Sequence, residues 1–201
     1  MKKRILCLCT ALFSLWTNAY DVKTPALVPV KFQNAPKHDA LKIVDNGELK
    51  FAIVTDKNAE NIRRWREHKS IGPAVELLVE AFEKCTGKKP QVFDVSEIGE
   101  AEKYPFQILV GDSALTRKLG LDALNMPKQG YEIKTFPRGI AIVGSDSSRM
   151  KDYSKDSGPL RGTLWGAYDF VERFLGCRFF YPGEFGSLWP KIDNLGILPV
   201  I

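Results

Sequence analysis

The sequence predicts an α+β fold, an α/β sandwich in which one mixed β-sheet has two long helices and a short one packed mainly on one face. Three observations predict it. Short apolar runs with β-branched members recur between residues 49 and 143, as buried strands require. Two longer segments repeat apolar residues at spacings of three and four, which is typical of amphipathic helices. A strand, a Pro-Arg-Gly turn and a returning strand predict an antiparallel hairpin within the sheet.

The first nineteen residues are set aside from the fold because they have the pattern of a secretory signal peptide. Lys2, Lys3 and Arg4 precede an apolar run of about a dozen residues, and cleavage is predicted after Ala19. This run is shorter than the roughly 20 residues that span a bilayer. We therefore expect an exported protein, periplasmic or extracellular, with no membrane segment after signal cleavage.

The mature chain has the size of one domain and little net charge. Removing the leader leaves roughly 180 residues, too few for a catalytic barrel of about 250. Residues 20–40 are punctuated by prolines and are interpreted as a linker or irregular N-terminal segment, so 41–201 is the predicted domain. The chain has 29 basic and 24 acidic residues, but three basic ones lie in the leader, and a nucleic-acid partner is not expected.

The first half of the domain predicts a strand, a long helix and two further strands. Residues 49–55 suit a buried strand. Pro73 pre-sets the backbone of a helix start, and Gly87 is a natural left-handed cap at its end. The next two strands are predicted at 91–95 and 106–110.

The second half predicts a short helix, the hairpin and the last long helix. The short helix follows Gly111, and the hairpin joins 131–136 to 140–143. The last helix runs over about 160–175, with Gly162 and Gly166 in one row. Small residues in a row let a helix approach a sheet or another helix closely.

Two cysteines remain after signal cleavage, Cys85 at the end of one helix and Cys177 just after another. In an oxidising compartment they can form a disulfide. Their spacing in the sequence does not show that their Cα atoms come within the roughly 4.4–6.8 Å that a disulfide needs. The favoured interpretation is two separate buried thiols. Metal binding is not expected, because neither cysteine has a further ligand at the right spacing.

One motif resembles a catalytic serine. Residues 111–115, Gly-Asp-Ser-Ala-Leu, are similar to the Gly-Asp-Ser-Leu block of an esterase superfamily, with an extra alanine. A serine nucleophile needs a base, and that superfamily takes it from a histidine near the C-terminus. Here both histidines, His38 and His68, precede Ser113. A helix-capping role for Asp112 or Ser113 is therefore favoured, and a small serine esterase is the minor alternative.

The acidic and basic clusters also favour structural roles. Asp169 and Glu172 share one face of a helix and are interpreted as a solvated edge rather than the paired carboxylates of a glycosidase. No catalytic, cofactor-binding or metal-binding residue is predicted. Two further clusters are interpreted as solvated charged loops, although the basic one can also bind an anion or a uronate: Asp94, Glu97, Glu100 and Glu102, and Arg63, Arg64, Trp65 and Arg66.

The candidates for domain docking or sugar contact are Trp165, Tyr181, Glu184 and Trp189. Trp165 falls inside the last helix and is expected to be packed. For Tyr181 and Trp189, docking onto a second domain is favoured over contact with a glycan, because large apolar patches mark interfaces.

Four blocks resemble the N-terminal accessory domain of bacterial alpha-glucuronidase-like and beta-hexosaminidase-like glycoside hydrolases, in order and spacing. They are 74–87 (AVELLVEAFEKCTG), 106–113, the hairpin residues 130–133 and 139–142, and the closing unit of 162–176 with 178–184. In that family the domain precedes a (β/α)₈ barrel, which carries the catalytic residues. The resemblance implies a non-catalytic part of an exported enzyme of polysaccharide degradation, with the barrel as its partner. A stand-alone carbohydrate-binding or adaptor protein, which would bind polysaccharide or oligosaccharide, remains the alternative.

Overall fold

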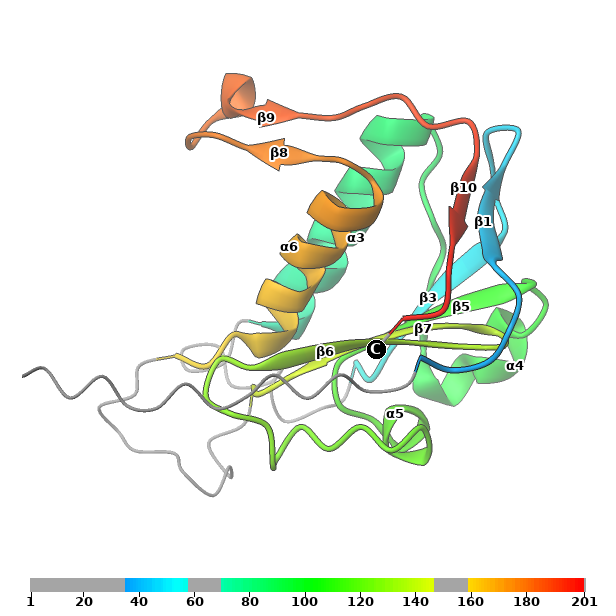
Figure 1. Ribbon diagram of the computed structural model, residues 1–201, viewed down its shortest axis with the longest axis vertical. Helices are drawn as coiled ribbons and strands as arrows, with labels where there is room; N and C mark the ends of the chain where they lie inside the picture. Colours follow the sequence, from blue (N-terminus) through cyan, green and yellow to red (C-terminus); the bar gives the residue numbers. More distant parts are fainter. Residues whose placement is uncertain (1–34, 58–69, 147–158, 201) are drawn as a thin grey trace, which may run out of the picture. The chain divides into compact units, whose positions relative to one another are not determined.

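The computed structural model describes residues 35–57, 70–146 and 159–200 (Figure 1). The predicted leader, most of the predicted linker, the basic cluster at 63–66 and His68 lie outside the described residues. The described part forms the α+β arrangement that the sequence predicts, around one mixed sheet.

The central sheet has five strands in the order β4-β3-β5-β7-β6. Four of them are parallel, and β6 pairs antiparallel with β7 at one edge. Residues 137–138 form the turn of this hairpin, because Phe136 pairs with Gly139. The strands are β3 (Phe51–Thr55), β4 (Val92–Asp94), β5 (Phe106–Val110), β6 (Tyr131–Phe136) and β7 (Gly139–Gly144).

Helices cover both faces of the sheet. The long helices α3 (Ile71–Thr86) and α6 (Gly162–Phe174) pack side by side on one face (Figure 1). The short α5 (Ala114–Lys118) packs against the other face, together with α4 (Ile98–Ala101) and the 3₁₀ turn η1 (Val95–Glu97) before it. Alternation along the strands explains this division, since each strand presents apolar side chains to both faces.

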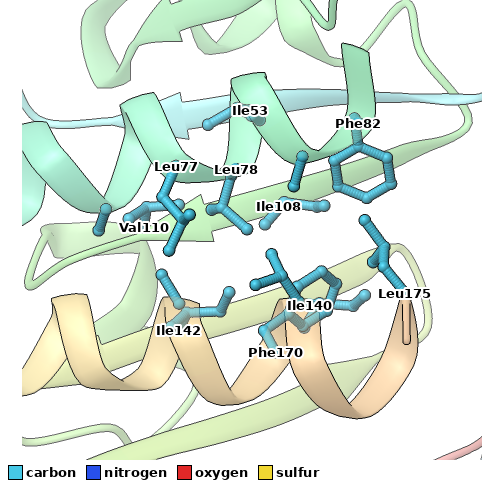
Figure 2. Close-up of a cluster of buried hydrophobic side chains, with 14 of the residues drawn as sticks. Ile53, Leu77, Leu78, Phe82, Ile108, Val110, Ile140, Ile142, Phe170 and Leu175 are labelled. Carbon is cyan, nitrogen blue, oxygen red and sulfur yellow. The ribbon is translucent and has the colours of Figure 1, made fainter. Parts of the chain in front are cut away.

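The larger core lies between the sheet and the two long helices. Ile108 and Val110 of β5 point to this side, whereas Leu109 joins the core under α4 and α5. Figure 2 shows Leu77, Leu78 and Phe82 of α3 meeting Phe170 of α6 over the sheet isoleucines. A strand buried on both faces needs consecutive apolar residues, as β5 has from Ile108 to Val110.

Helix α3 has the boundaries that its sequence predicts at the C-terminal end. Gly87 adopts φ +76°, and its N–H donates to the Glu83 carbonyl at 2.8 Å. At the N-terminal end, the Ser70 hydroxyl does not cap its own helix but accepts a bond from the Leu164 N–H at 3.0 Å. Ser70 therefore joins the starts of α3 and α6.

Helix α6 lies unusually close to the sheet, as its glycine row predicts. A Cβ on Gly162 would lie 2.3 Å from the Gly130 carbonyl oxygen, and one on Gly144 would lie 2.1 Å from the Gly162 carbonyl carbon. A Cβ on Gly166 would lie 2.9 Å from the Ile142 side chain. Only glycine permits this approach of helix backbone to strand backbone.

The start of α6 is also fixed by buried polar groups. The Thr163 N–H donates to Asp146 at 3.0 Å, and its hydroxyl donates to the second oxygen of the same carboxylate. The Thr163 hydroxyl also accepts from the Gly144 N–H at 2.9 Å. A carboxylate at a helix N-terminus satisfies free N–H groups and complements the helix dipole.

Three strands outside the central sheet were not predicted. They form a small sheet in the order β10-β1-β2, in which Leu41 of β1 pairs with Ile197 of β10. Strands this short carry little periodicity, and the β1–β10 pairing joins opposite ends of the domain. The strands are β1 (Leu41–Asp45), β2 (Glu48–Leu49) and β10 (Leu195–Ile197).

Cys85 and Cys177 are both buried free thiols, as the favoured interpretation of the sequence expects. Their Sγ atoms nevertheless lie 3.8 Å apart, where the last turn of α3 meets the chain just after α6. This proximity was not predicted, because it depends on the parallel packing of the two helices, which brings their C-terminal ends together.

Candidate functional site

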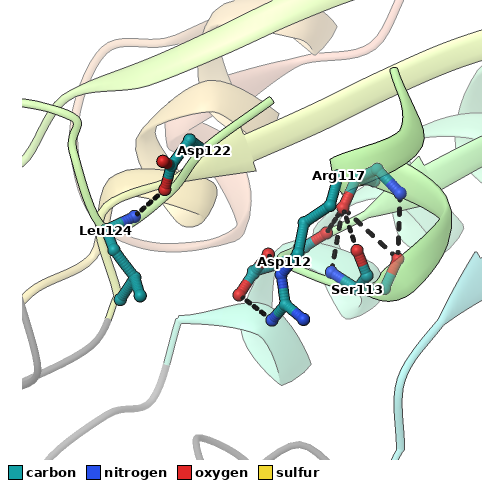
Figure 3. A network of polar contacts seen from close by, with 7 residues as sticks. Asp112, Ser113, Arg117, Asp122 and Leu124 are labelled. Carbon is teal, nitrogen blue, oxygen red and sulfur yellow. Dashed lines mark hydrogen bonds and ion pairs between the residues drawn. The ribbon is translucent and has the colours of Figure 1, made fainter. Parts of the chain in front are cut away.

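The serine motif after β5 forms a helix cap. Ser113 is buried, and its hydroxyl accepts a bond from the Thr116 N–H at 3.3 Å, while the Thr116 hydroxyl accepts from the Ser113 N–H at 2.8 Å. Arg117 binds Asp112 through two bonds of 2.9 and 2.5 Å (Figure 3). The described histidine, His38, instead bonds Thr135 at 2.9 Å. This geometry is the capping arrangement that the sequence favours over a nucleophile.

Two of the acidic candidates, Asp169 and Asp94, make structural contacts. Asp169 forms an ion pair with Arg173 at 2.6 Å on the surface of α6. Asp94 was interpreted as a loop charge, and this is wrong: it ends β4, is 6% exposed and accepts bonds from the Lys57 and Ser96 N–H groups. The Ser96 hydroxyl also donates a hydrogen bond to Asp94. This bond is the largest cause, ahead of the two backbone bonds, that lowers the pKa of Asp94 below its ordinary value. Among the described residues, no group of three or more His, Cys, Asp or Glu side chains is arranged to hold a metal ion.

The described residues with the most unusual exposure lie on a two-stranded hairpin after α6. Its strands β8 (Arg178–Phe179) and β9 (Ser187–Leu188) pair antiparallel around a tip that contains the 3₁₀ turn η3 (Glu184–Gly186). Gly183 adopts φ +111°, a conformation that side chains disfavour. A Cβ on Gly186 would lie 1.7 Å from the Tyr181 carbonyl oxygen. The glycines of this segment therefore shape the tip.

Four large apolar side chains of this hairpin face solvent. Phe180 is 71% exposed, Tyr181 59%, Phe185 87% and Leu188 52%. We call these four residues the hairpin patch. An isolated exposed apolar side chain is ordinary, but several on one short segment mark an interaction surface.

The hairpin also forms one wall of a groove of about 860 Å³ against the two long helices. Leu77, Glu80 and Lys84 of α3 and Tyr168 of α6 line the opposite wall. In Figure 1 the hairpin extends over the C-terminal ends of α3 and α6. The groove therefore combines aromatic walls with one acidic and one basic side chain.

The hairpin is joined to the domain by packed aromatic rings. Phe179 contacts Tyr168 and Trp189 edge-on, with ring centroids 5.1 and 5.4 Å apart. Lys84 places its Nζ 4.7 Å from the centre of the Trp189 ring and also forms an ion pair with Glu80 at 2.7 Å. Edge-to-face rings and a cation over an aromatic face are both favourable arrangements. The root of the hairpin is thus fixed while its tip is exposed.

The structure brings two of the four candidate residues together. Tyr181 and Trp189 both line the groove, but Trp189 is half-buried. Trp165 was expected to be packed, and this is wrong: it is 44% exposed on α6 and donates to the Gln129 side chain at 3.2 Å. The Glu184 side chain lies outside the described part of the structure.

Sequence reasoning missed three of the four members of the hairpin patch. Phe180, Phe185 and Leu188 were not singled out, although residues 179–189 combine five aromatic residues with Pro182 and two glycines. An aromatic-rich segment with turn residues and no helical or strand periodicity was the available signal.

The described residues contain no helix long and apolar enough to cross a membrane. Comparison with known proteins found no family model that matches this chain and no curated protein that matches it.

Proposed function

We propose that this protein is the non-catalytic accessory domain of an exported glycoside hydrolase, and that the hairpin patch docks onto the (β/α)₈ barrel that carries the chemistry. The observation that carries the proposal is the exposure of four large apolar side chains on a hairpin with a rigid root. The order of the four sequence blocks supports the choice of partner.

The energetics favour an interface at this position. Burying a Phe or Leu side chain stabilises an association by about 1.5–3 kcal/mol relative to leaving it in water. The hairpin patch therefore offers several kcal/mol to a partner with a complementary apolar surface. Because Phe179 and Trp189 already fix the root, the hairpin loses little conformational freedom when it docks.

The first test reads the genomic DNA beyond the codon for Ile201 in all three forward frames, and the neighbouring genes. We expect a frame or a gene that encodes a glycoside-hydrolase barrel. If neither is present, the proposal is overturned, because the domain then has no barrel to support.

The second test measures the docking itself. The barrel found in this way is produced with the wild-type domain and with the Phe180→Ser/Phe185→Ser double variant. We expect co-purification with the wild type and a loss of at least tenfold in affinity with the variant. Leu198→Ser is the matched control, since Leu198 is 72% exposed but lies after β10, outside the hairpin. Equal binding by both variants would exclude the hairpin as the interface.

Export is proposed on the predicted leader alone. We expect the protein recovered from the periplasm or medium of a bacterial host to begin at Tyr20. Amino-terminal sequencing checks this, and a cytoplasmic chain that retains Met1 or Lys2 would contradict it.

A stand-alone carbohydrate-binding protein remains the second candidate because of the groove. Its aromatic walls suit sugar rings, and Glu80 and Lys84 could bind hydroxyl or carboxyl groups. This function predicts that oligosaccharides, including uronic acid-bearing ones, quench tryptophan fluorescence and that Trp189→Phe abolishes the response. The accessory-domain proposal predicts no response to free oligosaccharides.

A further inference from the structure

Two thiols from distant parts of the chain touch in the core. Cys85 lies in the last turn of α3, and Cys177 follows Gly176, whose φ of +75° turns the chain after α6. The cysteines are 92 positions apart in the sequence, yet their Sγ atoms are 3.8 Å apart. Both side chains are fully buried.

Backbone hydrogen bonds hold the two cysteines in this arrangement. The Cys177 N–H donates to the Val171 carbonyl at 3.2 Å, and the Cys85 carbonyl accepts from the Ile192 N–H at 2.9 Å. A disulfide places its sulfurs about 2.0 Å apart, so the present contact closes with a movement of about 2 Å.

The chain offers these two thiols no competing partner once its leader is removed. It contains four cysteines, and the other two, Cys7 and Cys9, lie within the predicted signal peptide. A mature chain with two cysteines has one intramolecular connectivity. In the oxidising compartment that the leader implies, such thiols form disulfides and keep them.

We propose that Cys85 and Cys177 form a structural disulfide when the protein is exported. The Sγ–H bonds of both cysteines break and one Sγ–Sγ bond forms. The two protons and two electrons pass to a disulfide oxidant, for example oxidised glutathione, whose S–S bond breaks to give two molecules of glutathione. The bond forms in two exchange steps, through a mixed disulfide with the oxidant.

The disulfide forms during folding rather than after it. In the folded chain both sulfurs are inaccessible to an oxidant, and burial raises the pKa of both thiols, that of Cys177 to about 12. The thiolate is the attacking species, so folded thiols react slowly. The same burial protects the finished disulfide from reductants.

The bond has a structural consequence for the proposed docking hairpin. Arg178, the first residue of β8, directly follows Cys177, so a bond to Cys85 ties the root of the hairpin to α3. It also closes a loop of about 90 residues, and long loops gain most from cross-linking in the chain-entropy model.

Peptide mapping tests the proposal. The full chain is exported from a bacterial host, unfolded in denaturant that contains N-ethylmaleimide at harvest, so that buried free thiols are also blocked, and digested with trypsin without reductant. We expect one linked product of residues 85–88 and 174–178, which separates on reduction. Alkylation of both cysteines in the exported chain would overturn the proposal.

A refolding experiment separates the disulfide from the proposed export. The chain is unfolded, reduced and refolded with a mixture of oxidised and reduced glutathione. The linked product is expected here even if the leader fails to export the chain in the host. If the refolded chain keeps two free thiols, the proposal is overturned whatever its location.

Thermal unfolding provides a second measurement. The oxidised chain should have a midpoint roughly 5–15 °C above that of the chain that was reduced while unfolded and then refolded and heated with reductant. The Cys85→Ala/Cys177→Ala double variant is the control and should not respond to reductant. An equal response of both proteins, or none in the wild type, would contradict a stabilising bond.

Discussion

Helix α6 and the β8–β9 hairpin follow each other in the sequence and are both rich in aromatic residues and glycine, yet they use them in opposite ways. In α6, Phe170 is fully buried, and Gly162 and Gly166 bring the helix against the sheet. In the hairpin, glycines shape a tip that holds Phe180 and Phe185 in solvent. Composition alone does not distinguish a core element from an interaction surface. Whether an element belongs to the core or to the surface depends on which other elements of the fold pack against it.

The difference extends to the polar groups. At the start of α6, Thr163 and Asp146 form a buried hydrogen-bonded cluster. Such a cluster rigidifies its surroundings when its members are satisfied. Among the described groups of the hairpin tip, the hydrogen bonds join backbone atoms, such as the Phe180 N–H to the Gly186 carbonyl at 2.7 Å. We therefore expect changes in α6 to affect stability and changes in the hairpin patch to affect binding.

The largest effect is expected from Phe170→Ala. Phe170 packs between Phe82 and Phe174, with ring centroids 6.4 and 5.2 Å away. Truncation leaves a cavity in the larger core and should lower the free energy of unfolding by about 3–5 kcal/mol. Denaturant unfolding measures it, and a loss below about 1 kcal/mol would show that the core collapses to fill the space.

Gly166→Leu should lower the free energy of unfolding by about 3 kcal/mol, because the new side chain has no room beside Ile142 and Tyr131. Gly72→Leu is the matched control: Gly72 lies in the first turn of α3 with no atom within 4 Å of an added Cβ. Thermal midpoints measure both. An unchanged midpoint for Gly166→Leu would mean that the close contact of α6 with the sheet is not required.

Thr163→Val should lower the free energy of unfolding by about 2 kcal/mol. Valine fills the same volume but removes the hydroxyl that donates to Asp146 and accepts from the Gly144 N–H. Thr163→Ser retains the hydroxyl and should cost less. Equal stability of the valine variant and the wild type, by denaturant unfolding, would contradict a stabilising role for this cluster.

The smallest effect on stability is expected from Phe185→Ser. Phe185 is 87% exposed, so its replacement should change the free energy of unfolding of the isolated domain by no more than about 0.5 kcal/mol. Denaturant unfolding of the isolated domain checks this. A loss comparable to that of Phe170→Ala would show that Phe185 packs within the domain, and would remove the contrast between the two regions.

The sequence by itself determined the two long helices and the strands of the central sheet. Periodicity located α3, α6, β5 and the β6–β7 hairpin, and glycine chemistry predicted the cap at Gly87 and the close approach of α6. The capping role of Ser113 was also predictable, because its geometry depends on neighbours in the chain. These features are local, and the residues that cause them lie within a few positions of one another.

Only the tertiary structure decided which surfaces are covered. The exposure of Trp165 and of the hairpin patch, the pairing of Leu41 with Ile197, and the contact of Cys85 with Cys177 all depend on segments far apart in the sequence. A residue's spacing within its own element does not show whether a distant element packs over it. For this reason the sequence predicted an aromatic, turn-rich segment after α6, but not which of its aromatic side chains face solvent.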